Sequence, residues 1–170
     1  MANRKSDLDV VSKWVQADGP TNVRAIFSDL GVDYVEEPTP SNESGYIEVK
    51  EGAFRVVVNS LEGAQRRLFT AAHELGHYLM HRDLLVKYGR LDRETRHSDR
   101  LFENRAMNED APFSPAHEVQ ANRMAAQILM PASKVKRLHA GGTTASDDLA
   151  REFGVSTAAM DIRKKTLGLD

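Results

Sequence analysis

Two histidines stand four residues apart in the segment His73-Glu74-Leu75-Gly76-His77. On a helix this spacing places both imidazoles on one face, about 6 Å apart, so that both can bind one metal ion. Glu74 flanks the same face and can reach a water bound to that metal. A zinc peptidase needs this order of ligand, general base and ligand. The alternative is a surface helix that carries two histidines by chance, but its apolar flanks and mid-helix glycine favour a built site.

The composition is that of an ordinary globular protein. The chain has 170 residues, enough for one domain with a single core, and 41% are hydrophobic and 28% charged. A net charge of −2 gives no overall attraction to nucleic acid or anionic lipid. Because cysteine is absent, His, Glu and Asp are the strong metal ligands that remain. No apolar leader or membrane-length apolar run occurs, so we expect a cytoplasmic protein with no membrane partner.

A catalytic zinc site also needs a third protein ligand and an open position for water. The candidates downstream of the histidine pair are acids and histidines: Asp83, Asp92, His97, Asp99, Glu103, Glu109, Asp110, His117 and Glu118. Those within residues 83–111 lie in a densely charged stretch with little apolar periodicity. Such a stretch is typical of a solvated loop, so none of its acids is favoured as a ligand.

Glu118 and Asn122 differ from these candidates because they lie on the inward stripe of a helix that begins after Pro115. The apolar positions of that helix are Ala121, Met124, Ala125, Ile128 and Leu129. A buried carboxylate or amide is costly without a partner. A metal would serve Glu118, and a ligand side chain would serve Asn122. His117, beside Glu118 and near the same face, remains the rival third ligand.

His81 continues the histidine face but is excluded as a ligand by distance. It lies eight residues, or about 12 Å along the helix axis, beyond His73, too far for both to reach one ion. We expect it at the helix end or in support of a ligand. A tetrahedral oxyanion would need a further donor, and the candidates stay open. They are Tyr78, Tyr88, His97 and His117.

The elements that must position these residues predict an α+β fold. The β-branched runs 46–49 and 54–58 indicate a hairpin, and 32–35 an extra strand, so that a small sheet packs on the histidine helix. The apolar stripe that would face the sheet is Leu68, Ala71, Ala72, Leu75 and Leu79. We expect one domain over 1–170: N-terminal helices and sheet in 1–63, the histidine helix in 64–82, a charged loop in 83–114, the third-ligand helix in 115–130 and C-terminal helices in 131–170.

The C-terminal helices offer a competing interpretation. Residues 147–153 and 157–167 read as helix, tight turn and helix, and the second carries Arg163, Lys164 and Lys165. DNA binding is therefore conceivable. The basic excess over residues 131–170 is slight, however, which favours helices that close a core. We do not expect a nucleic-acid partner.

Two runs together resemble a known family. Residues 69–81 (Phe69 to His81), followed by 118–131 (Glu118 to Pro131), are similar to the ImmA/IrrE family of zinc metallopeptidases. The pairing of H-E-L-G-H-Y with E-x-x-A-N-x-x-A-A-x-x-L-M-P carries the resemblance. It is close over residues 54–131 and weaker over 143–169.

The resemblance implies a gluzincin-like site with one Zn²⁺ ion, in which His73, His77 and Glu118 bind the metal. Glu74 would be the general base, and Asn122 would steady a metal-bound histidine. Members of the family often lie in toxin–antitoxin-like modules beside a helix-turn-helix repressor, which some cleave or bind. We therefore expect a zinc endopeptidase whose substrate is such a repressor or antitoxin.

Three alternatives to this function remain. The first is a toxin or regulator that binds its partner with little proteolysis. The second is a DNA-binding regulator that acts through the C-terminal helices. The third is a structural zinc site, although structural sites usually fill all four positions and this chain offers three good ligands.

Overall fold

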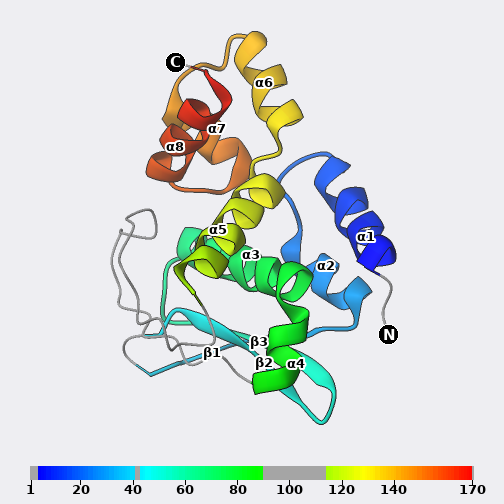
Figure 1. Ribbon diagram of the computed structural model, residues 1–170. Helices are drawn as coiled ribbons and strands as arrows, with labels where there is room; N and C mark the ends of the chain where they lie inside the picture. The colour runs from blue at the N-terminus through cyan, green and yellow to red at the C-terminus, as the bar shows by residue number, and fades with distance from the viewer. Residues whose placement is uncertain (1–3, 41–42, 90–113, 170) are drawn as a thin grey trace.

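A computed structural model describes residues 4–40, 43–89 and 114–169 (Figure 1). The fold is α+β, as predicted, with a small mixed sheet among helices. The elements in chain order are α1 (Arg4–Gln16), α2 (Val23–Leu30), β1 (Asp33–Glu37), β2 (Gly45–Lys50), β3 (Ala53–Asn59), α3 (Ala64–Met80), α4 (Arg82–Tyr88), α5 (Pro115–Leu129), α6 (Ala132–Ala140), α7 (Ser146–Phe153) and α8 (Thr157–Leu167).

The sheet has the strand order β1-β3-β2. β2 and β3 form the predicted antiparallel hairpin, in which Ile47 pairs with Val56. The hairpin turns at Glu51 and Gly52, whose φ angles of 52° and 81° are those of a turn that follows the twist of the strands. β1 is the predicted extra strand and lies parallel to β3, with Tyr34 opposite Val56.

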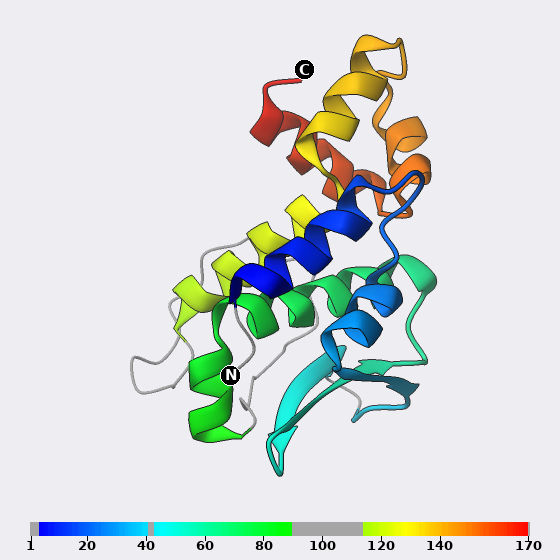
Figure 2. The same ribbon diagram turned by 90° about the vertical axis from the view of Figure 1, so that its right-hand side faces the viewer.

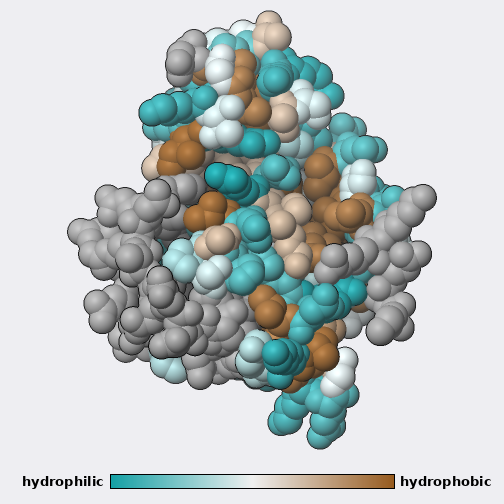
Figure 3. Space-filling model, in the orientation of Figure 1, coloured by the Kyte–Doolittle hydropathy of each residue, from teal (hydrophilic) through white to brown (hydrophobic). Residues whose placement is uncertain are grey.

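α3 is the central helix of the fold, and it lies between the sheet and α5 (Figures 1 and 2). All its residues from Thr70 to Leu79 are buried. Val56 and Val58 of the sheet and Ala72 and Leu75 of α3 are completely inaccessible to solvent and belong to one core. Because these residues are buried, the histidine segment is a core segment and not a surface helix. On the face of the molecule that Figure 3 shows, hydrophobic side chains form small groups among hydrophilic ones.

Gly76 allows α3 and α5 to approach closely. A Cβ atom at this position would lie 2.9 Å from the carbonyl oxygen and 3.1 Å from the Cα of Ala121. Both atoms belong to backbone, which cannot swing aside as a side chain can. The mid-helix glycine therefore costs helix propensity but sets the distance between the two helices that carry the candidate site.

We predict that Gly76→Ala destabilises the protein, although alanine favours a helix over glycine by about 1 kcal/mol. Overpacking against the backbone of Ala121 costs typically about 1–3 kcal/mol, so the net fall in the free energy of unfolding should be up to about 2 kcal/mol. Urea denaturation measures this quantity. Gln65→Ala, at an exposed position of the same helix, is the matched control and should change it by less than about 0.5 kcal/mol. Greater stability of Gly76→Ala than of the wild type would contradict the account.

The start of the predicted charged loop is helical, which corrects one prediction. Residues 82–88 form α4 after a break at His81, whose φ of −121° ends α3. Leu85 is fully buried, and Arg82 forms an ion pair with Asp7 of α1. These contacts come from elements distant in sequence, so the local charge pattern could not reveal the helix. The rest of the predicted loop, residues 90–113, lies outside the described residues.

The C-terminal helices occupy one end of the molecule, around the end of α5 (Figure 1). Arg163 is buried and its Nε donates to the carbonyl of Met130 at 2.9 Å, and burial lowers its pKa. Lys164 Nζ donates to the carbonyl of Thr144 at 2.8 Å. Two of the three cations that suggested DNA binding thus hold backbone carbonyls of the protein itself. Among the described residues, no helix is long and apolar enough to cross a membrane.

Candidate metal centre

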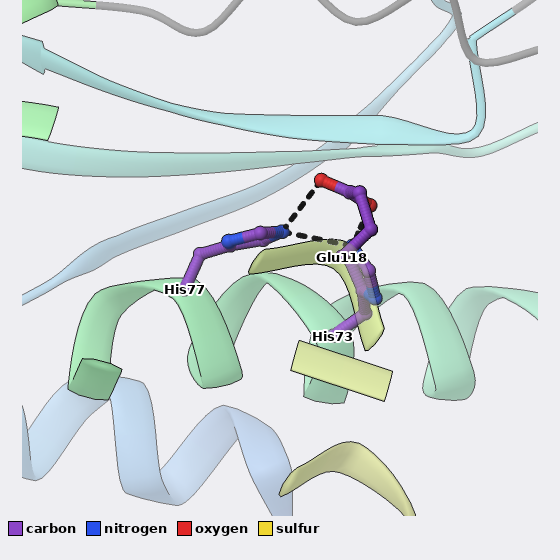
Figure 4. Close-up of side chains that lie close together, drawn as sticks. All are labelled: His73, His77 and Glu118. Atoms are coloured by element: carbon purple, nitrogen blue, oxygen red, sulfur yellow. Dashed lines mark hydrogen bonds and ion pairs between the residues drawn. The ribbon is translucent and has the colours of Figure 1, made fainter. Parts of the chain in front are cut away.

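Three predicted metal ligands lie together at the contact between α3 and α5. Figure 4 shows the imidazoles of His73 and His77 and the carboxylate of Glu118 pointing toward one another. The two imidazole Nε2 atoms are 3.0 Å apart. Glu118 Oε2 is 3.1 Å from His73 Nε2, and Glu118 Oε1 is 3.1 Å from His77 Nε2. Both histidines are buried, and the Glu118 side chain is 18% exposed.

The donor set fits a tetrahedral metal ion. Zinc binds imidazole nitrogen at about 2.0–2.1 Å, which places the corners of its tetrahedron about 3.3 Å apart. The three separations of 3.0–3.1 Å are close to this value. Two imidazoles and one carboxylate are ligands that zinc accepts readily. The residues could therefore hold one ion and leave a coordination position for a small molecule.

Asn122 contacts the Nδ1 atom of the His73 ring, whereas the Nε2 atom of that ring faces Glu118 and His77. The side chain is buried, and its Oδ1 lies 2.7 Å from His73 Nδ1. An amide oxygen accepts only, so His73 Nδ1 donates and Nε2 keeps its lone pair for a metal. The sequence predicts that the partner of Asn122 is the side chain of a metal ligand, and the side chain that Asn122 contacts is that of His73.

We predict that Asn122→Leu weakens zinc binding by about 10- to 100-fold, because loss of such a partner frees the ligand ring to rotate and change tautomer. Asn122→Asp keeps an acceptor at the same place and should retain near-normal affinity. Competition with a chromophoric chelator measures the zinc Kd of both variants. Equal affinity of Asn122→Leu and the wild type would show that His73 needs no such support.

Glu74 is buried on α3, with 1% of its surface exposed, and follows His73 in the chain, but it is not one of the three converging donor groups. Among the other predicted candidates, Asp83 is exposed in the first turn of α4. The acids and the histidine between residues 92 and 110 lie outside the described residues. Among the described candidates, those that converge are His73, His77 and Glu118.

His117, the rival third ligand, belongs to the start of α5. Its Nδ1 accepts from the backbone N–H of Ser114 at 3.1 Å, which caps the helix. Its ring packs edge-on against His81 at 4.7 Å between centroids. The geometry therefore turns Glu118 toward the histidine pair, while His117 caps the helix.

Tyr78, a candidate oxyanion donor, packs within the core. Its ring meets Phe54 edge-on at 5.0 Å, and the Arg82 guanidinium lies 4.1 Å from its centroid. Burial raises the pKa of its hydroxyl. Tyr88 is 46% exposed near the end of α4, and His97 lies outside the described residues. Tyr78 therefore packs against residues of β3 and α4.

One residue near the site, Gln120, is not among the residues that the sequence pattern indicates. Gln120 Oε1 lies 2.9 Å from His81 Nε2, and His81 Nδ1 lies 2.9 Å from His77 Nδ1. An exposed glutamine on a helix carries no sequence signal of such a contact. His81 itself lies at the end of α3 beside His77, as its spacing predicts.

Comparisons with known proteins agree with the motifs. The family profile described as the IrrE N-terminal-like domain, Peptidase M78, matches residues 27–165. No curated protein gives a significant match. Among solved structures, a Mycobacterium tuberculosis transcriptional regulator has a TM-score of 0.55 at 16% identity, a likeness of fold alone. The match covers 94% of this chain and 46% of that protein, so the chain spans about half of it. With most of its length matched by the family profile, the chain belongs to the ImmA/IrrE family of metallopeptidases.

Proposed function

We propose that the protein is a zinc-dependent endopeptidase that cleaves a regulatory protein, with a helix-turn-helix repressor or antitoxin as its substrate class. One observation carries the proposal: two imidazole nitrogens from α3 and a carboxylate from α5 converge within 3.0–3.1 Å, and α3 also buries Glu74. Membership of a metallopeptidase family supports it. A repressor substrate would place the reaction in the cytoplasm.

In this proposal His73, His77 and Glu118 would hold the zinc. When bound, zinc supplies Lewis acidity that polarises a peptide carbonyl and makes water more acidic. Glu74 accepts a proton from the attacking water and then delivers it to the leaving amine. Asn122 keeps His73 in the tautomer that binds metal. Three protein ligands would be one fewer than a structural zinc site usually has, which favours a catalytic over a structural ion.

A mixture of peptides from a digested bacterial lysate tests the activity without knowledge of the partner. Mass spectrometry should find new peptide termini after incubation with the zinc-loaded protein. A chelator should prevent these cleavages, and added zinc should restore them. A complete lack of new termini in the zinc-loaded sample would count against a peptidase that cleaves many different peptides. A peptidase specific for one partner needs a separate test with that partner.

The partner experiment uses any helix-turn-helix repressor that is found encoded beside this chain. Purified repressor should be cut into discrete fragments by the wild-type protein and left intact by the chelated protein. If both forms capture the repressor uncut, the protein is a binding regulator, and the proposed proteolysis is wrong. The exposed Lys165 offers a control for the DNA alternative, because Lys165→Ala should not change cleavage.

A further inference from the structure

Three histidines lie at intervals of one turn along α3 and its C-cap, and the third, His81, is not one of the donors that converge at the metal centre. The ring centroids of His73 and His77 are 4.7 Å apart, and those of His77 and His81 are 5.0 Å apart. His81 is 5% exposed and is not among the three converging donors. Burial of a polar ring beside a metal ligand needs a reason.

The hydrogen bonds around His81 have a direction. Gln120 Oε1, 2.9 Å from His81 Nε2, is an amide oxygen and can only accept, so Nε2 carries the proton. In a neutral imidazole the other nitrogen is then an acceptor. His81 Nδ1 therefore accepts from His77 Nδ1 at 2.9 Å. As a result, His77 Nε2 keeps its lone pair on the side of Glu118.

The same arrangement exists at the other ligand, where Asn122 accepts from His73 Nδ1. α5 thus supplies an amide oxygen for each histidine ligand: Asn122 acts directly on His73, and Gln120 acts on His77 through His81. We propose that His81, held by Gln120, is the positioning residue that fixes the tautomer and ring orientation of His77. This inference rests on the proposed zinc function.

The proposal would be wrong if the hydrogen bonds from Gln120 through His81 to His77 ran in the opposite direction. If the Gln120 amide nitrogen donated to His81 Nε2, His81 Nδ1 would donate to His77 Nδ1. His77 Nε2 would then carry a proton, donate to Glu118 Oε1 at 3.1 Å and be unable to bind metal. The two directions leave opposite tautomers on both rings, and these can be distinguished without any activity.

Nuclear magnetic resonance of the zinc-free protein, labelled with ¹⁵N in its histidine rings, makes this distinction. At about pH 8 unperturbed imidazoles are neutral, and two-bond ¹H–¹⁵N correlations identify the tautomers. We expect the Nδ1–H form at His77 and the Nε2–H form at His81. The Nε2–H form at His77, or the Nδ1–H form at His81, would overturn the proposal. Gln120→Leu should mix the tautomers of His81, whereas Gln127→Leu, exposed on the same helix, should not.

Zinc affinity gives a second readout. His81→Phe fills the site with a ring that cannot accept, and we expect the zinc Kd to rise by about 10- to 100-fold. His81→Asn places an amide oxygen near the position of the lost Nδ1 and should restore affinity to within a few-fold of wild type. His139→Phe on α6 is the matched control and should leave the Kd unchanged. Wild-type affinity in His81→Phe, or no rescue in His81→Asn, would overturn the proposal.

The two readouts also separate this inference from the proposed function. If the protein is not a peptidase, cleavage is absent while the tautomers and the zinc affinities of the variants keep their expected pattern. If only the role of His81 is wrong, cleavage by the wild type persists and that pattern fails. Should His81→Phe not fold, the wild-type spectrum and the His81→Asn affinity still decide.

Discussion

Glu74→Gln is expected to reduce peptide hydrolysis by about 10²- to 10⁴-fold while one zinc ion stays bound to each chain. The amide has almost the shape of the carboxylate, so the buried position should accept it, but it cannot take a proton from water. The three metal ligands are untouched by this change. Initial cleavage rates and elemental zinc analysis of the same protein sample measure the two expected results.

Glu152→Gln is the matched control for this prediction. It makes the same chemical change at an exposed position of α7 and should leave both the rate and the zinc content as in the wild type. Full activity of Glu74→Gln with zinc bound would remove Glu74 from the mechanism. Loss of zinc from this variant would instead make Glu74 a contributor to metal binding.

Glu118→Ala is expected to weaken zinc binding by roughly 100-fold or more, since loss of a supporting partner alone costs 10- to 100-fold. The substitution leaves two imidazoles whose Nε2 atoms are 3.0 Å apart, with no carboxylate to complete the site. Activity should be lost with the metal. Chelator competition gives the Kd, and circular dichroism checks that the helices remain.

His117→Ala is the informative comparison for Glu118→Ala, because the two residues are neighbours and the sequence offers either one as the third ligand. His117 accepts from the Ser114 backbone, so its loss should lower stability by about 0.5–2 kcal/mol, as for other helix caps, with zinc affinity unchanged. Tight zinc binding by Glu118→Ala together with loss in His117→Ala would reverse the assignment.

The sequence predicts the parts of the site that follow from helical periodicity and burial. The spacing of His73 and His77 places both on one face of α3. Asn122 lies on a buried stripe and needs a partner, which is His73. Periodicity alone could not separate Glu118 from His117, because adjacent helix positions can both lie near one face. Ser114, three residues before His117, is a capping residue and was the signal that could have done so.

The parts that local pattern could not predict depend on contacts between distant segments. Leu85 is buried and Arg82 pairs with Asp7, so α4 forms in a stretch whose charges indicate a loop. The parallel pairing of β1 with β3 joins strands that are separated along the chain by β2. Gln120 is exposed and has no local feature that distinguishes it from a solvated side chain.

The central claim is that His73, His77 and Glu118 hold one catalytic zinc ion. An anomalous difference map from zinc-containing crystals, recorded at the zinc absorption edge, tests it most directly. We expect one peak per chain, about 2.0–2.1 Å from both Nε2 atoms and about 2.0–2.2 Å from a Glu118 oxygen, with a non-protein atom in the fourth position. A peak at other residues, or a fourth protein ligand that closes the site, would contradict the account.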